Sequence, residues 1–157
     1  GTGSLSRTLD ERGAEVVGVD ISDKLIDVAK NRSAANKNIE YFAGDMKEQS
    51  FGNFDYIIAM DSLIHYSPED TISSIVEFSK RANNSVLFTV IPSTFVLRTK
   101  LRLGKCFPKS ERSPEIVPME LDNLHQLEAI KSNASLKKIA RIKRFFYVSE
   151  AWEFAHK

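Results

Sequence analysis

The sequence predicts an α/β fold with a mostly parallel sheet, helices on both faces and an antiparallel hairpin at the carboxyl-terminal edge. Apolar segments of strand length alternate with helix-like segments along most of the chain, as in βα units of a parallel sheet. Glycine or aspartate follows several of the strand-like segments, where such sheets carry their ligand-binding loops. The last two segments are both strand-like, and this order predicts the hairpin.

The expected strands are apolar runs bounded by acids or turn residues, and the expected helices carry apolar residues one turn apart. Strands are predicted at 15–20, 38–42, 54–60, 85–91, 136–143 and 146–154. Helices are predicted at 4–12, after residue 22, after residue 67, at 95–103 and at 120–131, with a loop at 105–118. The chain is therefore expected to form one domain over residues 1–157.

Two helices have clear start signals. Ser22 can cap a helix whose expected inward face is Leu25, Ile26 and Ala29. Ser67 can cap the next one, with Pro68 at its first position and Asp70 completing a capping box. Ile72, Ile75, Val76 and Ser79 then follow at helical spacing.

Composition excludes several classes of protein. The formal net charge of +1 gives no global signature of nucleic-acid binding. With one cysteine, Cys106, no disulfide can form within the chain and a cysteine-based metal site is not expected. Cys106 itself is predicted to be a buried structural thiol. No apolar run has the length of a membrane span.

A glycine loop and an acid suggest a nucleoside site. Gly1 and Gly3 stand directly before a predicted helix, where the missing Cβ atoms let the backbone approach a bound group. Asp20 ends a predicted strand seventeen residues after Gly3, a spacing at which an acid accepts hydrogen bonds from ribose hydroxyls. Alone, the glycines also fit a flexible end and Asp20 fits a turn.

Two further strand ends extend this pattern. Asp45 follows the second strand and can accept from an exocyclic adenine amine, while Met46 packs on the ring. A plain turn is the alternative at this position. The third strand is followed by the loop 61–66, in which His65 can orient or deprotonate an acceptor, or only bond to neighbouring backbone.

This arrangement resembles a Rossmann-like class I S-adenosylmethionine-dependent methyltransferase. In that family the glycine loop holds the amino-acid part of the cofactor, and acids after the next two strands hold ribose and adenine. The resemblance implies S-adenosylmethionine as co-substrate. It implies these cofactor-binding residues: Gly1, Gly3, Asp20, Ile21, Asp45, Met46, Asp61 and Ser62.

Two longer strings resemble the magnesium-protoporphyrin IX methyltransferase family. They are AMDSLIHY at 59–66 and the stretch 88–118, and the tail FYVS at 146–149 is also similar. The resemblance implies methyl transfer to a propionate of magnesium-protoporphyrin IX, giving the 13-monomethyl ester in chlorophyll or bacteriochlorophyll biosynthesis. The magnesium is carried by the substrate and no metal is bound by the protein. Implied substrate-binding residues are His65, which is also the catalytic candidate, Tyr66, Arg98 and Lys105.

The same resemblance implies a handover from the magnesium chelatase large subunit. It implies a location in the cytoplasm or plastid stroma, peripheral to photosynthetic membranes. A basic stretch around Arg98 and Lys105, interleaved with apolar residues, suits a dianionic macrocycle. A solvated amphipathic helix face and weak contact with a membrane surface are the alternatives for this stretch.

Family members carry an amino-terminal arm and a first, central strand before the glycine loop. Neither precedes Gly1 here, so we expect a partial chain that is not stable or active alone. Two other functions remain open. One is methyl transfer to another small acceptor such as a quinone precursor, and the other is a non-catalytic domain that keeps the fold and binds a partner.

Overall fold

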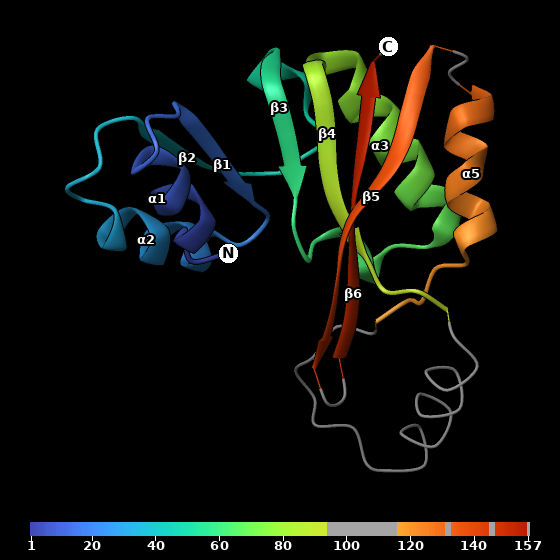
Figure 1. Cartoon of the computed structure of the whole chain (residues 1–157). Helices are drawn as coiled ribbons and strands as arrows, with labels where there is room; N and C mark the ends of the chain where they lie inside the picture. Colours follow the sequence, from blue (N-terminus) through green and yellow to red (C-terminus); the bar gives the residue numbers. More distant parts are fainter. Residues whose placement is uncertain (94–115, 131–132, 145–146, 157) are drawn as a thin grey trace. The chain divides into compact units, whose positions relative to one another are not determined.

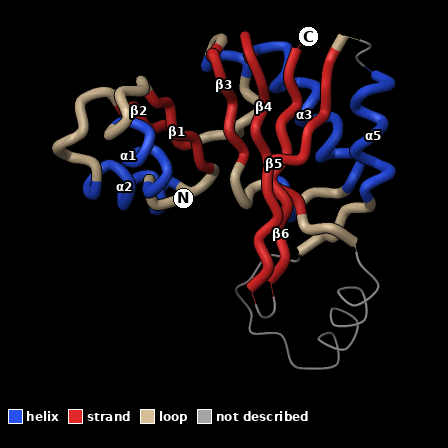
Figure 2. The backbone as a smooth tube through the Cα atoms, in the orientation of Figure 1, coloured by secondary structure: helices blue, strands red, loops and turns tan. Residues whose placement is uncertain are grey.

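The computed structural model describes residues 1–93, 116–130, 133–144 and 147–156. These residues form two compact units, Gly1–Phe51 and Gly52–Lys157, and each is described by itself. Figure 1 shows the order of the elements along the chain, and Figure 2 shows which segments are helix, strand or loop. The predictions of a helix at 95–103 and of a buried Cys106 lie outside the described residues.

The first unit is a two-stranded parallel sheet with two helices. Its main elements are α1 (Ser4–Asp10), β1 (Val16–Asp20), α2 (Asp23–Arg32) and β2 (Ile39–Ala43), followed by the short helix η1 (Gln49–Phe51). β1 and β2 pair without a register shift, from Val16 opposite Ile39 to Asp20 opposite Ala43. The small core consists of Ile26, Ala29 and Tyr41, with Ile39 packed against it.

Helix α2 begins as expected, but its inward face is narrower. The Ser22 side chain accepts a hydrogen bond from the Leu25 amide, which confirms the cap. Ile26 and Ala29 are buried, whereas Leu25 is 37% exposed, so its expected inward position was wrong. The reason is that the core partner of α2 is the Tyr41 cluster, which Ile26 and Ala29 contact one turn apart.

The second unit is a four-stranded mixed sheet packed against two helices. Its elements in chain order are β3 (Phe54–Ala59), the short helix η2 (Leu63–His65), α3 (Pro68–Arg81), β4 (Ala82–Val90), α5 (Leu121–Ile130), β5 (Ala134–Arg144) and β6 (Tyr147–His156). The strand order is β3-β4-β6-β5. β3 and β4 are parallel, and β6 is antiparallel to both of its neighbours, which confirms the terminal edge hairpin. β4 starts directly after α3, earlier than the expected residue 85.

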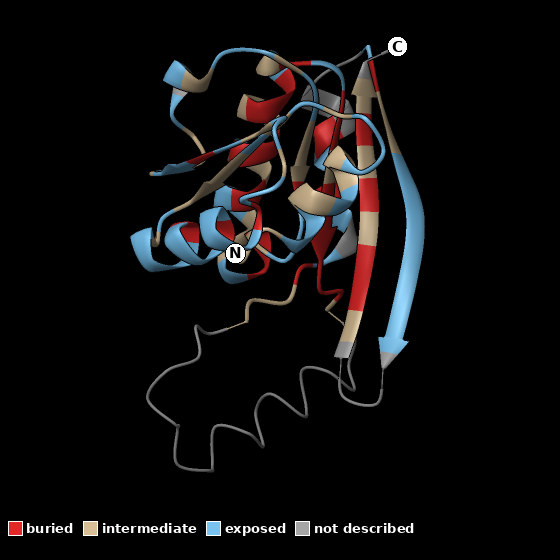
Figure 3. Cartoon of the chain, turned by 90° about the vertical axis from the view of Figure 1, so that its left-hand side faces the viewer, coloured by how far each residue is buried: buried red, intermediate tan, exposed pale blue. Residues whose placement is uncertain are grey.

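The core of the second unit is one apolar face of this sheet. Phe88 lies opposite Trp152, and Val86 lies opposite Phe154, so the four side chains share a face. All four are buried, which agrees with the expectation that Trp152 packs the terminal strand. Helix α3 contacts β3, β4 and β6, and α5 contacts α3 and β5. Figure 3 shows the buried residues concentrated along the inner strands and helices and the exposed ones along β5.

Helix α3 begins as predicted, and its buried face includes two of the four residues that follow at helical spacing, Ile75 and Ser79. Ser67 accepts from the Asp70 amide and donates to the Asp70 carboxylate, and Pro68 occupies the first turn. Ile72 and Val76 are only partly buried. The buried residues are Thr71, Ser74, Ile75, Phe78 and Ser79. Thr71, Ser74 and Ser79 can lie in the interior because their hydroxyls donate to backbone carbonyls.

The fold class is confirmed: parallel strand pairs, helices and an antiparallel carboxyl-terminal hairpin form the described structure. The strands form two separately bonded sheets, so helices on both faces of one sheet stay a prediction. The prediction of a single domain also stays a prediction. None of the described helices is long and apolar enough to cross a membrane.

Candidate functional site

The glycine loop leads into α1 in a conformation that favours glycine. Gly3 has φ 74° and occupies the N-cap position without a side-chain cap. A Cβ on Gly3 would clash with the Tyr41 hydroxyl and lie 3.1 Å from the Ala29 Cβ. The loop can therefore come this close to α2 and β2 only because residue 3 lacks a side chain.

Three residues that the sequence did not single out hold this loop. Arg7 donates to the Thr2 carbonyl at 3.1 Å and to the Ser33 hydroxyl at 3.4 Å. The Ser33 and Tyr41 hydroxyls are 2.9 Å apart and hydrogen-bonded. These contacts join α1, α2 and β2, so the loop rests on a framework built from separate segments. No local signal marks these residues, because Arg7 and Ser33 are 26 positions apart.

Asp20 lies beside the glycine loop. Its Oδ1 accepts the Ser22 amide at 2.8 Å, and its Oδ2 binds the Gly1 amino group. Burial acts to raise the Asp20 pKa, but the hydrogen bonds from the Gly1 nitrogen and the Ser22 amide outweigh it and hold the pKa below the ordinary value of 3.8. Asp20 is therefore ionised at neutral pH, and a carboxylate of this kind accepts hydroxyl donors.

Asp45 lies at the same end of the first sheet. Asp20 pairs with Ala43, and the Gly44 amide donates to the Asp20 carbonyl at 3.0 Å, so Asp45 follows within two residues. Asp45 is exposed and its Oδ1 accepts the Lys47 amide at 2.9 Å. Ile21 is 80% exposed. An acid on each strand end and an exposed apolar side chain suit a ligand with polar edges and a flat apolar face.

The loop after β3 in the second unit is tied to β4. Asp61 has φ 52°, unusual for a residue with a side chain, and its amide donates to Thr89 Oγ1 at 2.8 Å. The Thr89 hydroxyl donates back to Asp61 Oδ1 at 3.2 Å. Ser62 Oγ is buried without a hydrogen-bond partner in the part of the chain that the structure describes. Strained residues and unsatisfied polar atoms of this kind are concentrated at functional sites.

His65 is exposed at the end of η2, on a loop with a buried base. Leu63 and Ile64 are buried, and the Val117 amide donates to the Ile64 carbonyl at 2.8 Å. Tyr66 is half-buried, and its amide donates to the Leu63 carbonyl at 3.1 Å. The loop therefore presents the His65 imidazole to solvent from a fixed backbone, as a group that orients a ligand requires.

The structure brings the predicted site residues into two groups. Gly1, Gly3, Asp20, Ile21, Asp45 and Met46 lie at the carboxyl end of the β1–β2 sheet. Asp61, Ser62, His65 and Tyr66 lie on one loop of the second unit. Arg98 and Lys105 lie outside the described residues. That all these strand ends meet on one sheet edge stays a prediction, as do the individual roles.

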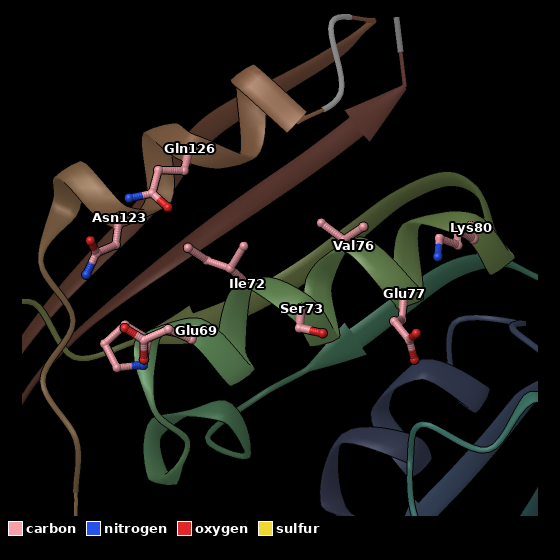
Figure 4. A pocket seen from close by; sticks show the side chains of 9 residues that line it. Glu69, Ile72, Ser73, Val76, Glu77, Lys80, Asn123 and Gln126 are labelled. Carbon is pink, nitrogen blue, oxygen red and sulfur yellow. The ribbon is translucent and has the colours of Figure 1, made fainter.

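A groove of about 440 Å³ runs between α3 and α5, and none of the predicted site residues lines it. Figure 4 shows Ile72 and Val76 along its floor, with Asn123 and Gln126 on the α5 side. Within the described residues, no group of three or more histidines, cysteines or carboxylates could hold a metal ion. The groove therefore shares no lining residue with either group of predicted site residues.

Comparison with known proteins identifies the family. Residues 1–83 match a model described as "Methyltransferase domain". Residues 59–156 match one described as "Magnesium-protoporphyrin IX methyltransferase C-terminus". The chain belongs to the magnesium-protoporphyrin IX methyltransferase family. The expectation of a class I S-adenosylmethionine-dependent methyltransferase is thereby confirmed.

Named relatives in this family match between 69% and 98% of the chain. Magnesium-protoporphyrin O-methyltransferase of Rhodobacter capsulatus is 43% identical over 98% of the chain and 68% of its own length. The Synechocystis enzyme of that name is 32% identical over 69% of the chain. The chain spans 48% of the length of the Synechocystis relative and 36% of an Arabidopsis thaliana relative.

A solved family member has the same fold. The crystal structure of magnesium protoporphyrin IX methyltransferase from Synechocystis PCC 6803 with bound S-adenosylhomocysteine superposes with a TM-score of 0.84. It is 25% identical and covers 100% of the chain and 71% of the solved protein. That protein binds the product of the methyl donor, so the family resemblance extends to a structure with a ligand of this class.

Proposed function

We propose that the protein transfers a methyl group from S-adenosylmethionine to a propionate of magnesium-protoporphyrin IX. The products are the 13-monomethyl ester and S-adenosylhomocysteine, in chlorophyll or bacteriochlorophyll biosynthesis. The observation that carries the proposal is the match of residues 59–156 to the family model, because this stretch includes the Asp61–Tyr66 loop. The names of the relatives from Rhodobacter and Synechocystis also support it.

The first unit supplies the groups that would hold the methyl donor. The loop at Gly1 and Gly3 would hold the amino-acid part, and the missing Cβ of Gly3 lets the loop backbone lie close to Tyr41 and Ala29. Asp20 is ionised and accepts the ribose hydroxyls, and Asp45 accepts the adenine amine. Ile21 and Met46 offer apolar surface for the adenine ring.

The methyl acceptor needs little acid–base help. A free carboxyl group has a pKa near about 4, so a propionate is already ionised at neutral pH. It can attack the sulfonium methyl carbon in line, with the sulfur leaving as the neutral thioether. Catalysis then rests on alignment, which supplies roughly 7–11 kcal/mol in well-oriented reactions. Under this proposal His65 positions the propionate or a neighbouring group, with Tyr66, Arg98 and Lys105 as further substrate contacts.

The substrate carries its magnesium before it arrives, so a magnesium-inserting enzyme must act upstream. The proposal therefore includes a handover from the magnesium chelatase large subunit. It also places the protein in the cytoplasm or plastid stroma, with at most peripheral contact with photosynthetic membranes. Co-sedimentation of the protein with vesicles and with the purified subunit tests these two parts.

Methyl transfer from radiolabelled S-adenosylmethionine to magnesium-protoporphyrin IX by the full-length protein tests the central proposal. The expected product carries one label per porphyrin, on an ester that mild base removes. A quinone precursor is the matched competitor, since ubiquinone biosynthesis O-methyltransferases of Coxiella burnetii are 35% identical over 60% of the chain. Preferential methylation of the quinone precursor would replace the proposal with that alternative.

A further inference from the structure

The β5–β6 hairpin contains a carboxylate with no solvent exposure. Glu150 on β6 is 0% exposed, and its Oε1 lies 3.4 Å from Lys138 Nζ and 3.5 Å from Arg141 Nε. Its Oε2 is buried with no hydrogen-bond partner among the described residues. Burying a carboxylate is costly unless it is paired, and here two cations on the neighbouring strand lie beside it.

A β-bulge brings these two cations to the same face. Lys138 pairs with Trp152 and Ala140 pairs with Ala151, so Ile139 is an extra residue in β5. In a regular strand, residues three apart point to opposite faces. Because of the bulge, Lys138 and Arg141 share one face with Glu150, and Lys138 also lies over the Trp152 ring, 5.7 Å from its centroid.

The Arg141 guanidinium has further donors besides the Nε atom that faces Glu150. Its contact with Glu150 uses Nε, which leaves the two terminal nitrogens, and the side chain is 37% exposed. The group formed by Lys138, Arg141 and Glu150 has a net charge of +1. A partly exposed guanidinium whose terminal nitrogens make no polar contact within the described part of the chain is suited to two parallel hydrogen bonds with a carboxylate.

The register places Arg141 at the same end of the sheet as the His65 loop, although β5 and β3 are the strands at its opposite sides. Both β4 and β5 are antiparallel to β6, so β3, β4 and β5 all run in one direction. Val90, the last residue of β4, lies opposite Glu150, which lies opposite Arg141. Two strand spacings, about 10 Å, therefore separate Arg141 from the end of β4. Figure 1 shows the hairpin continuing past that end.

We propose that Arg141, restrained by Glu150, binds the second propionate of the porphyrin, the one that is not methylated. This inference rests on the proposed function and adds a specificity site to it. It explains why a buried carboxylate is placed beside two edge-strand cations, and it gives a dianionic acceptor a second anchor. With that anchor, the other propionate reaches the methyl donor in a fixed orientation.

The test compares two acceptors in the full-length protein. One is magnesium-protoporphyrin IX, and the other is its analogue with the second propionate converted to a primary amide. We expect the unaltered protein to disfavour the amide in kcat/KM by about 10- to 100-fold, since a charge-assisted pair is lost. Arg141→Gln should methylate both at the same reduced rate, because the group that distinguishes them is gone. Arg141→Lys should retain part of the preference.

Lys137→Gln is the matched control. It removes one positive charge from the same strand, but Lys137 lies opposite Glu153, on the other face of the sheet. The amide preference should survive in this variant. If Arg141→Gln keeps the full preference, or lowers kcat/KM while the preference persists, the residues only brace the hairpin and the inference is wrong.

Glu150→Gln provides a second measurement if Arg141→Gln fails to fold. It keeps the shape of the side chain and should raise KM for the parent porphyrin while weakening the amide preference. An unchanged amide preference in Glu150→Gln overturns the inference. Methyl transfer by the unaltered protein distinguishes failure of the proposed function from failure of this site. If the unaltered protein transfers no methyl group, both are overturned. If it does, and the variants still disfavour the amide analogue as strongly, only the site is overturned.

Discussion

The Asp61 amide and carboxylate both bond to one hydroxyl, that of Thr89 on the neighbouring strand. The amide donates at 2.8 Å, and the hydroxyl donates to the carboxylate at 3.2 Å. Thr89 is buried, and it holds Asp61 at φ 52°. The start of the loop that carries His65 is therefore held by β4 as well as by β3, the strand that precedes the loop.

Thr89→Val removes this hydroxyl and keeps the side-chain shape. We expect kcat/KM to fall about 10-fold or more, because the loop loses the hydroxyl that bonds both the amide and the carboxylate of Asp61 and can relax from its strained conformation. Thr89→Ser is the matched control, since it retains the hydroxyl. Steady-state kinetics of both variants provide the measurement, and equal activities for valine and serine would contradict the role.

Gly3→Ala should destabilise the cofactor loop beyond the cost of its backbone conformation. Gly13→Ala serves as the control, because Gly13 also has a positive φ, 88°, but an added Cβ there meets nothing within 4 Å. Both variants pay about 1 kcal/mol for the left-handed backbone. Only Gly3→Ala also clashes with the Tyr41 hydroxyl.

Urea unfolding and S-adenosylmethionine binding distinguish the two contributions. Gly3→Ala should lose roughly 2 kcal/mol or more of unfolding free energy and bind the cofactor more weakly. Adding Tyr41→Phe should recover part of the loss, since it removes the clashing oxygen. Equal effects of Gly3→Ala and Gly13→Ala would show that the Tyr41 contact is unimportant.

Local signals correctly predicted the starts of α2 and α3 and the end of β1. The Ser22 and Ser67 caps depend on residues within three positions, and Asp20 follows its own strand, so neighbouring residues suffice to predict them. The apolar period of α3 gave its helix but not its inward face. Thr71 and Ser74 are buried there, because their hydroxyls donate to the Leu63 and Asp70 carbonyls.

Contacts between distant segments could not be predicted in this way. Thr89 is 28 positions from Asp61, and nothing in either neighbourhood marks the pair. The bulge at Ile139 could not be predicted from the sequence either, because no glycine or proline marks this one-residue shift in register. It decides which cations share a face with Glu150, so that cluster became apparent only from the paired strands.

Asp20→Asn should change stability in a pH-dependent way. The Asp20 pKa is held below 3.8, so the ionised carboxylate stabilises the folded state fully above that value. This stabilisation is lost as the pH falls through the lowered pKa. The difference in unfolding free energy between the parent protein and Asp20→Asn should therefore be constant from about pH 7 to about pH 5 and shrink below pH 4.

Carboxyl NMR shifts and urea unfolding across this range provide the measurement. The same substitution should weaken S-adenosylmethionine binding at neutral pH by about 10-fold, because an amide accepts fewer hydroxyl donors than a carboxylate. A titration midpoint for Asp20 above 3.8 would contradict the hydrogen-bonding account of its environment.

His65→Ala and His65→Asn together separate positioning from proton abstraction. His65 is exposed on a backbone fixed by the buried Leu63 and Ile64, so neither change should alter the unfolding free energy by more than about 0.5 kcal/mol. A propionate has no proton to lose at neutral pH, so the imidazole has only to hold a group in place. Asparagine can donate a hydrogen bond but cannot act as a base.

We therefore expect His65→Ala to lower kcat/KM by about 10- to 100-fold, the equivalent of a hydrogen bond to a charged group. His65→Asn should recover a substantial part of that loss. If proton abstraction were required, asparagine would be as inactive as alanine, because neither side chain accepts a proton near pH 7. Full turnover by His65→Ala would exclude both positioning and proton abstraction by His65. Tyr66 would then be the candidate on this loop for contacting the acceptor.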